Sequence, residues 1–212
     1  MGSTNLDKYQ NTLWINRWLI RRFYTRVGSL LEGLSIGSVV DVGCGEGFAL
    51  EWLAERFRAA RTVGVDLRPN ALQFAREHGK TAAFFSAADV YHLPFGADTF
   101  DLVLCLENLE HLDRPAEALG ELSRVTRHWC LISVPLEPYF RTLSLLRGRY
   151  LRSWGNHPEH VQNFSVRRFR KLLSQQLIIE RFETCFPWQL ALCRKTRNDG
   201  PDDQKERDNL HG

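Results

Sequence analysis

The sequence lacks any hydrophobic run of the length that a membrane span requires. A helix that crosses a bilayer needs about 20 consecutive apolar residues, and no stretch of the 212 residues approaches this. The N-terminus has no apolar signal core, and Leu6 stands where an N-myristoylation signal requires Ser or Thr. We therefore expect a soluble protein of the cytoplasm.

A strong excess of one charge is also missing. The chain has 28 Lys and Arg residues against 25 Asp and Glu residues, which gives a formal net charge of +3. Proteins that hold nucleic acid by bulk electrostatics have a larger basic excess, although a local basic patch can still matter. The near balance predicts no stable binding of nucleic acid.

The cysteines show neither paired spacing nor an even number. None of the five stands in a C-x-x-C pair, so the pattern does not suggest a disulfide framework. An odd set without such pairs is typical of reduced, mostly buried thiols in a cytosolic protein. They are Cys44, Cys105, Cys130, Cys185 and Cys193.

What the chain does contain is an alternation of strand and helix patterns from Ser38 onward. The 43% hydrophobic content suffices for a core. Strands are predicted at 39–42, 62–65, 82–86, 102–106 and 130–134, followed near the end by strands at about 177–183 and 188–193. Helices are predicted at 50–57, 71–78 and 116–125, and a basic helix at 166–174 is capped by Ser165. This order is typical of βαβ units around a parallel sheet.

The chain divides into three parts by composition. Residues 1–37 form an N-terminal helical segment, in which apolar residues recur at helical spacing and several arginines lie mostly on the other side. Residues 38–194 carry the α/β pattern, and the polar residues 195–212 are expected to be a disordered tail. The apolar positions of the first helix are Trp14, Trp18, Leu19, Phe23, Val27, Leu30 and Leu31, and the arginines are Arg17, Arg21, Arg22 and Arg26.

The most informative stretch is the glycine-rich run that follows the first predicted strand. Asp41 lies in this strand, and Gly43, Gly45 and Gly47 then alternate with other residues immediately before a helix. Glycines let the backbone turn sharply and approach a ligand closely, and a helix N-terminus offers free N–H groups. The spacing G-x-G-x-G differs from the G-x-G-x-x-G of nicotinamide-binding proteins.

This run resembles motif I of the class I S-adenosylmethionine-dependent methyltransferases, and the resemblance, to a type-11 methyltransferase-like family, extends over about 38–134. It is carried further by the stretches Val63–Leu67, Ala88–Val90, Leu93–Phe95 and Phe100–Cys105. The family implies a Rossmann-like, doubly wound, mostly parallel α/β sheet of seven strands, with the last strand antiparallel.

The resemblance also assigns a cofactor site. It implies that Asp66 accepts hydrogen bonds from the ribose hydroxyls of S-adenosylmethionine, and that Asp89 accepts one from the adenine amino group. The full set of implied cofactor-binding residues is Asp41, Gly43, Cys44, Gly45, Gly47, Asp66, Leu67, Asp89, Val90 and Leu106.

The acceptor should meet the donor beyond the carboxyl ends of the strands, where ligands bind in doubly wound sheets. After Pro135 the βα alternation stops for about thirty residues, a length typical of functional loops. This segment, about 136–164, mixes aromatic and arginine residues. It is either a solvated basic helix that packs its aromatic residues on the core, or a lid over a small-molecule or lipidic acceptor. The second possibility includes peripheral contact with a membrane surface.

Methylation of a hydroxyl requires the loss of its proton, and imidazole suits this task at neutral pH. His111 and His160 are therefore the predicted bases, with Glu110 beside His111. The run Glu107-x-x-Glu110-His111 also resembles an E-x-x-E-H motif of two methyltransferase groups, which implies Mg²⁺ or Mn²⁺ held by Glu107, Glu110, His111 and His160. Without a metal, the two acids are ordinary strand-end and helix-cap residues.

The sequence thus predicts transfer of a methyl group to oxygen of a small or lipidic acceptor. Two other classes remain open: a nicotinamide-dependent oxidoreductase, which the glycine spacing disfavours, and a non-catalytic S-adenosylmethionine-binding partner subunit. The polar residues from Glu107 to His111 argue against the second. No N-P-P-Y-type motif of nucleic-acid amino methylation is present.

Overall fold

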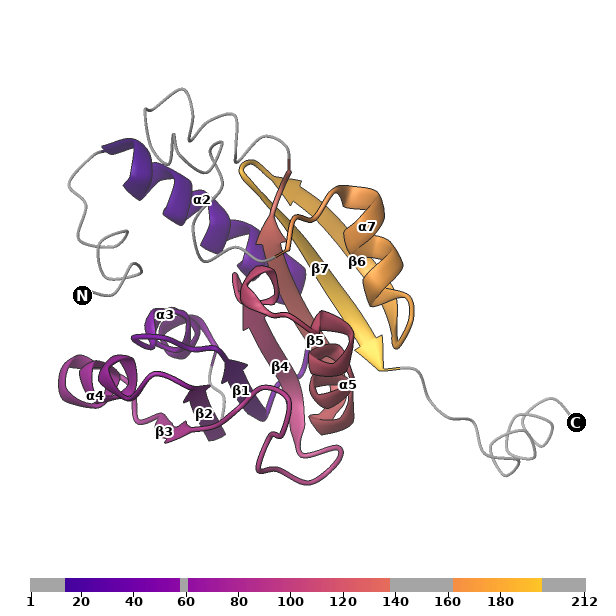
Figure 1. Cartoon of the computed structure of the whole chain (residues 1–212). Coiled ribbons are helices and arrows are strands. Elements are labelled where there is room, and N and C mark those ends of the chain that lie inside the picture. The colour runs from indigo at the N-terminus through magenta and orange to yellow at the C-terminus, as the bar shows by residue number, and fades with distance from the viewer. Residues whose placement is uncertain (1–13, 58–60, 138–161, 196–212) are drawn as a thin grey trace, which may run out of the picture.

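The computed structural model describes residues 14–57, 61–137 and 162–195, and these form an α/β fold around one seven-stranded sheet (Figure 1). The strand order is β3-β2-β1-β4-β5-β7-β6. The strands are β1 (Ser38–Val42), β2 (Arg61–Asp66), β3 (Phe84–Ala87), β4 (Phe100–Leu106), β5 (Thr126–Pro135), β6 (Leu177–Cys185) and β7 (Trp188–Lys195).

Five neighbouring strands, β3 to β5, run parallel, and β7 is inserted antiparallel between β5 and β6. The predicted seven-stranded, mostly parallel sheet with an antiparallel last strand is therefore confirmed. The chain leaves β1 toward β2 on one side and reaches β4 on the other, so the order reverses between β1 and β4. In such sheets this reversal opens a ligand crevice at the carboxyl ends of the strands.

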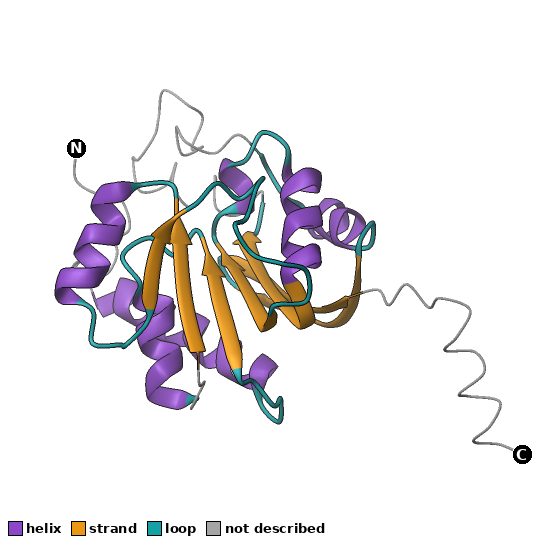
Figure 2. Cartoon of the chain, turned by 90° about the horizontal axis from the view of Figure 1, so that it is seen from below, coloured by secondary structure: helices purple, strands orange, loops and turns teal. Residues whose placement is uncertain are grey.

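Helices cover both faces of the sheet (Figure 2). On one face lie α2 (Trp14–Leu31), α3 (Phe48–Arg56) and α4 (Pro69–His78). The other face is covered by the short 3₁₀ helix η1 (Leu109–His111), α5 (Pro115–Val125) and α7 (Val166–Leu173). None of the helices in the described ranges is long and apolar enough to cross a membrane.

The two hydrophobic cores follow from the alternation of side chains along each strand. Val39 packs toward α2 and α3, whereas its neighbour Val40 packs toward α5. The same alternation separates Leu104 from Cys105 in β4. Because both faces are buried, these strands are apolar at nearly every position, which explains why they read as continuous apolar runs in the sequence.

The first helix differs from its prediction in the part that faces solvent. Phe23, Val27 and Leu31 are buried against the sheet as expected, but Trp14 is 76% exposed and Trp18 is 50% exposed. Trp18 and Phe23 are five residues apart, which at 3.6 residues per turn separates them by roughly 140° around the helix. The two tryptophans therefore lie on the arginine side of α2 and not on its apolar side.

The boundaries of the other elements agree with the sequence to within a few residues. The predicted cap of the basic helix is present, since the Arg168 N–H donates to Ser165 Oγ at 3.3 Å. Strand β7 continues to Lys195, one residue into the predicted tail, because Lys195 pairs with Leu177 of β6. The rest of that tail, 196–212, and most of the predicted lid lie outside the described residues.

Candidate cofactor and acceptor site

The glycine run forms a tight loop over the end of β2. The N–H groups of Gly43 and Cys44 donate to the carbonyl oxygen of Val65, at 2.8 and 3.0 Å. Gly43, Gly45 and Gly47 adopt positive φ values of 80°, 53° and 83°, a region that side-chain-bearing residues avoid. Gly47 then directly precedes α3. The N–H groups of Gly43, Cys44, Gly45 and Gly47 thus hold the loop itself in place, and the N-terminus of α3 is the part that can offer N–H groups to a ligand.

Asp66 connects this loop to the end of β2. Its Oδ2 accepts from the Gly45 N–H at 2.8 Å, and its Oδ1 accepts from the Arg68 N–H at 2.8 Å. The Arg68 guanidinium donates to both carboxylate oxygens at 3.2 and 3.3 Å. Asp66 is buried, whereas the Arg68 side chain is about half exposed at 48%. Asp66, the acid predicted to bind the ribose, is therefore paired with the Arg68 side chain, which is accessible to solvent.

The predicted adenine residues lie at the same edge of the sheet. The Ala88 N–H donates to the Asp66 carbonyl oxygen at 3.2 Å, which places the end of β3 beside the end of β2. Asp89 Oδ1 accepts from the Tyr91 N–H at 3.0 Å, so this carboxylate caps the turn that follows. Leu67, after Asp66, is 69% exposed. Val90 is partly buried against the core.

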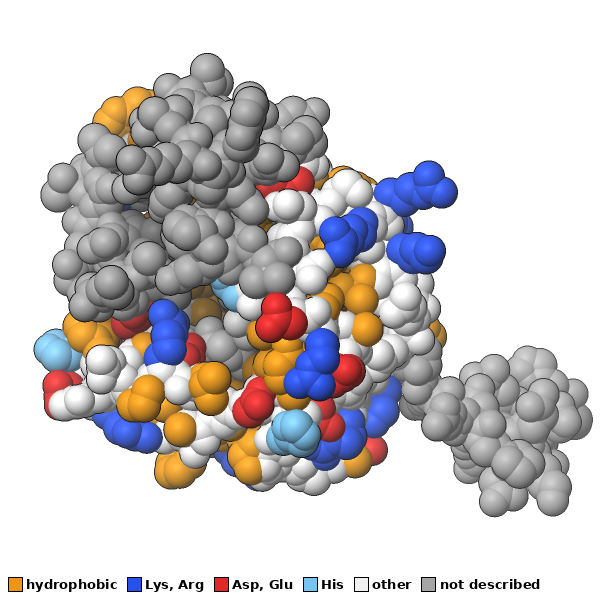
Figure 3. All heavy atoms as spheres, in the orientation of Figure 1, with side chains coloured by type: hydrophobic (Ala, Val, Ile, Leu, Met, Phe, Trp, Pro, Cys, Tyr) orange, Lys and Arg blue, Asp and Glu red, His pale blue; other side chains and the backbone are white. Residues whose placement is uncertain are grey.

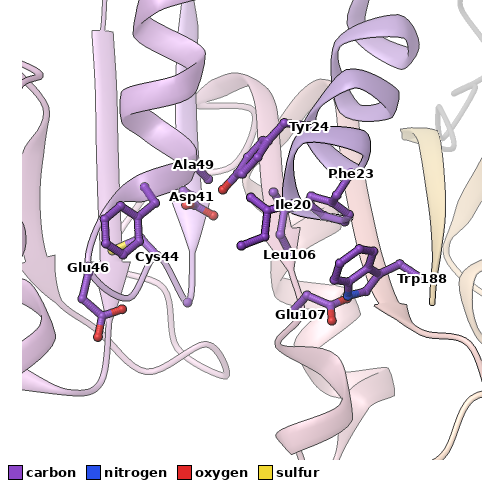
Figure 4. Close-up of a pocket in the computed structure, with 12 residues that line it drawn as sticks. Ile20, Phe23, Tyr24, Asp41, Cys44, Glu46, Ala49, Leu106, Glu107 and Trp188 are labelled. Atoms are coloured by element: carbon purple, nitrogen blue, oxygen red, sulfur yellow. The ribbon is translucent and has the colours of Figure 1, made fainter. Parts of the chain in front are cut away.

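A cavity of about 690 Å³, including its open part, lies where the first helix meets the glycine loop (Figure 4). Its walls come from α2, the loop, the start of α3, the end of β4 and the start of β7. The lining residues are Ile20, Phe23, Tyr24, Asp41, Gly43, Cys44, Glu46, Phe48, Ala49, Leu106, Glu107 and Trp188. Figure 4 shows the Tyr24 hydroxyl pointing toward Asp41. The cavity is thus lined by both aromatic side chains and carboxyl groups.

The electrostatics of this cavity favour a cation. Asp41, Glu46 and Glu107 contribute carboxyl groups, and the lining residues in the described part of the chain include neither Lys nor Arg. Asp41 is only 2% exposed. Its burial, assisted by the nearby charge of Asp66, raises the pKa of Asp41 to about 7. A positively charged ligand would stabilise the ionised form of this acid.

Two residues after β4 have special geometry. Glu107 has a φ of 56°, unusual for a residue with a side chain. Ser133 of β5 holds it there: the Glu107 N–H donates to the Ser133 carbonyl oxygen at 3.2 Å, and Ser133 Oγ donates to Glu107 Oε1 at 3.0 Å. Asn108 then lies over Gly43, where an added Cβ would come within 2.3 Å of Asn108 Nδ2. Gly43 thus provides the space that Asn108 occupies.

Glu110 and His111 lie just behind this cavity and do not line it. Glu110 is buried, and its Oε1 is 3.9 Å from His111 Nε2, whose side chain is 32% exposed. Within the described residues no group of three or more His, Cys, Asp or Glu side chains could hold a metal ion. His160 lies outside the described residues. The four-residue metal site therefore stays a prediction, and Glu107, Glu110 and His111 do not form one by themselves.

Both ends of the predicted lid are placed beside this site. The Leu136 N–H donates to the Pro187 carbonyl oxygen at 2.8 Å, next to Trp188. At the other end, the Gln162 N–H donates to the Glu110 carbonyl oxygen at 2.9 Å. The segment between them, 138–161, is outside the described residues.

Sequence reasoning missed several residues of the cavity wall. Phe48 directly follows the glycine run, so its position at the start of a helix could have indicated that it lines the site. Ile20, Phe23 and Tyr24 show only the apolar periodicity of a packed helix, and Trp188 only opens a strand. Their role comes from contacts between segments distant in the chain, which no local pattern reports.

Comparison with known proteins shows what the residues of this site are similar to. Residues 40–132 match the sequence model of a family whose description is methyltransferase domain. The chain is 33% identical over 132 residues to a ubiquinone biosynthesis O-methyltransferase of Alkalilimnicola ehrlichii, with 59% of this chain and 53% of that protein covered. It is also 33% identical over 115 residues to a fatty-acid O-methyltransferase of Mycolicibacterium smegmatis, with 53% and 41% covered.

A solved structure shares the fold over nearly the whole chain. Magnesium protoporphyrin IX methyltransferase from Synechocystis PCC 6803, with bound SAH, superposes with a TM-score of 0.67 and 18% identity, covering 92% of this chain and 95% of that one. The chain spans about half the length, or less, of the two curated relatives above. The matched residues include the glycine loop, Asp66, Asp89 and the Glu107–His111 run.

Proposed function

We propose that the protein, whose residues 40–132 match the model of a methyltransferase domain, transfers the methyl group of S-adenosylmethionine to an oxygen atom of a small or lipidic acceptor. Both curated relatives described above are named O-methyltransferases, one of ubiquinone biosynthesis and one of fatty acids. The observation that carries the proposal is the contact of Gly45 with Asp66, which joins the glycine loop to the acid at the end of β2.

On this proposal the ribose of the donor binds at Asp66. A ribose diol would replace the guanidinium of Arg68, while the Gly45 and Arg68 N–H groups continue to hold the carboxylate. Because the Arg68 side chain is about half exposed, it can move into solvent when the diol takes its place. The adenine would then extend along the same edge toward Leu67, Asp89 and Val90.

The charged end of the donor fits the acidic wall of the cavity. S-adenosylmethionine carries a sulfonium and an ammonium group against one carboxylate, so its amino-acid end is cationic. Asp41, Glu46 and Glu107 attract such a group. The loop residues Gly43, Cys44 and Gly47, together with Leu106, would then contact this end through short side chains or the backbone. The sulfonium supplies the activated methyl group.

The acceptor side needs a group that removes a proton and a wall that excludes water. Tyr24 and Trp188 provide aromatic surface in the cavity. His111 is our candidate base, and the buried Glu110 carboxylate near its Nε2 would stabilise the imidazolium that forms. His160 stays a second candidate on the ground of the sequence alone, and it lies outside the described residues.

Binding of the donor tests this proposal directly. Asp66→Ala should weaken the binding of S-adenosylmethionine and S-adenosylhomocysteine by roughly 1–3 kcal/mol, the usual effect of losing a charge-assisted hydrogen-bond partner. Glu77→Ala, which removes an exposed acid of α4, is the matched control and should leave the Kd unchanged. Isothermal calorimetry that detects no donor binding, or tighter binding of a nicotinamide cofactor, would contradict the proposal.

The predicted Mg²⁺ or Mn²⁺ is tested separately. Turnover is measured with excess EDTA, and again for Glu107→Gln, which keeps the shape of the side chain but removes its charge. Loss of activity in EDTA with recovery on adding the metal would support a metal site completed by His160. Full activity of both the chelated enzyme and Glu107→Gln would leave His111 to act without a metal.

A further inference from the structure

The solvent-facing side of α2 combines aromatic and cationic side chains. Trp14 and Trp18 are exposed, and they are one helical turn apart, so they lie on the same side of the helix. Arg17 and Arg21 are exposed on this side as well. The Arg22 guanidinium lies over the Trp18 ring, 5.2 Å from its centroid. We call these five residues the outer face of α2.

The charge of this helix is uncompensated within the helix itself. Its sequence has four arginines and no acidic residue. Arg26 is paired with Glu183 of β6, with 3.6 Å between Nη1 and Oε2. Among the residues that the structure describes, Arg17 and Arg21 take part in no ion pair. The outer face is therefore cationic. Figure 3 shows acidic and basic side chains mixed on the lower part of the described surface, and basic ones together at its upper right.

An adjoining side of the same helix forms a wall of the proposed acceptor cavity, since Tyr24 is seven residues, or about two turns, from Arg17. Ile20, Phe23 and Tyr24 line that cavity, and they lie within the same two turns as Trp18 and Arg21. Figure 1 shows α2 running along the end of the sheet at which β1 and β4 finish. Any surface bound by the outer face is consequently held close to the mouth of the cavity.

We propose that the outer face of α2 docks the protein on an anionic lipid surface. Tryptophan side chains favour the boundary between head groups and acyl chains, and arginines favour the phosphates of the head groups. An amphipathic helix that lies flat on a membrane has this composition. The proposal rests on the proposed function for its purpose, since docking would deliver a lipidic acceptor to the cavity that α2 lines.

A nucleic acid is the less suitable partner for this face. Binding to a phosphate backbone requires a cationic surface that continues over many phosphates. The outer face extends over only about two helical turns, and the net charge of the whole chain is only +3. Two exposed indoles separated by a single turn suit a lipid interface better than a strand of phosphates.

Vesicle sedimentation of the full chain tests the proposal. Vesicles of phosphatidylcholine with phosphatidylglycerol should bind the protein at low salt and release it at high salt, and vesicles of phosphatidylcholine alone should bind it weakly. Replacing both cations, Arg17→Gln with Arg21→Gln, should weaken the partition by about 30-fold, from about 1 kcal/mol for each charge. Trp14→Ala with Trp18→Ala should weaken it as well.

Matched controls remove the same groups elsewhere. Arg167→Gln with Lys171→Gln takes two exposed cations from α7, and Phe84→Ala takes an exposed aromatic residue from β3. These variants should partition like the unaltered protein. All variants are also titrated with S-adenosylhomocysteine, and unchanged donor affinity of the α2 variants shows that the fold and the donor site are intact.

The outcomes separate the two proposals. Absence of sedimentation at low salt, an equal loss in the α7 control, or tighter binding to a single-stranded oligonucleotide than to the anionic vesicles would each overturn the docking proposal, whatever the donor titration shows. Vesicle binding that depends on α2, in a protein that does not bind the donor, would instead contradict the proposed function alone.

Discussion

Substitution of Gly43 by alanine tests why the loop needs a glycine at this position: for the space beside its Cα, or only for its positive φ. A Cβ at Gly43 would lie 2.3 Å from Asn108 Nδ2 and 2.6 Å from Asn108 Cγ, and the residue has a φ of +80°. Gly33, at the end of α2, has a φ of +81° and would place its Cβ more than 4 Å from any neighbouring heavy atom. The two sites share their backbone conformation and differ in their surroundings.

The expected magnitudes follow from this difference. A left-handed conformation costs an L-residue roughly 1–2 kcal/mol, so Gly33→Ala should lower the free energy of unfolding by about that amount. Gly43→Ala adds the displacement of Asn108, whose Nδ2 donates to the Val42 carbonyl oxygen at 3.4 Å. Loss of one such hydrogen bond adds about 1 kcal/mol. Gly43→Ala should therefore be the more destabilising change, at roughly 2–4 kcal/mol, and it should also weaken donor binding.

A double-mutant cycle measures the contact itself. Asn108→Ala removes the atoms that the new Cβ would meet, so it should partly relieve Gly43→Ala, with a favourable coupling energy of about 1 kcal/mol. Urea denaturation of the four proteins in the cycle and of Gly33→Ala provides the free energies. If Gly43→Ala is no more destabilising than Gly33→Ala, or if the coupling energy is zero, the contact between Gly43 and Asn108 has no energetic importance.

Two further predictions concern carboxyl groups. Because burial raises the folded-state pKa of Asp41 to about 7, the folded ligand-free protein holds a proton that the unfolded chain releases. The bound proton therefore stabilises the folded protein fully below the unfolded-state pKa of Asp41. This stabilisation, up to about 4 kcal/mol of unfolding free energy, is lost as pH rises toward 7. Asp41→Asn should abolish this loss in thermal unfolding, and binding of the cationic donor near pH 6 should release protons in calorimetry. For Asp101, burial raises the pKa, but hydrogen bonds from Ser38, Gly37 and Arg127 outweigh burial and lower it. The ionised Asp101 therefore stabilises the folded protein at neutral pH, and this stabilisation is lost as pH falls through the folded-state pKa. Asp101→Asn should lower the free energy of unfolding at pH 7 by about 2 kcal/mol. A change below 0.5 kcal/mol, which is about the scatter of ordinary surface substitutions, would contradict this.

The elements of the fold were predictable because their signals are local. Mostly apolar runs of four or five residues, such as Val39 to Val42, indicate strands of a sheet covered on both faces when helical patterns separate them. The glycine loop was equally visible, since three alternate glycines after a strand have few uses other than a tight turn at a helix N-terminus.

The contacts between these elements could not be predicted from the sequence. The neighbouring strands set two of these contacts: Asn108 lies over Gly43, and Ser133 holds Glu107. Asn108 is 66 residues from Val42, whose carbonyl oxygen it contacts. The prediction that Trp14 and Trp18 lie on the apolar side of α2 was also wrong. Both fit the helical spacing of apolar residues, but neither belongs to the buried side of the helix.

The sequence by itself determined the order of strands and helices, the turn of the glycine loop and the acids that follow the second and third strands, because each depends on neighbours in the chain. Only the tertiary structure decided what the cavity is made of. It joins Tyr24 near the start of the described chain to Trp188 near its end and buries Asp41 between them. Burial and proximity are properties of the packed sheet, and they shift the pKa of Asp41 and shape the aromatic wall in ways that no single segment encodes.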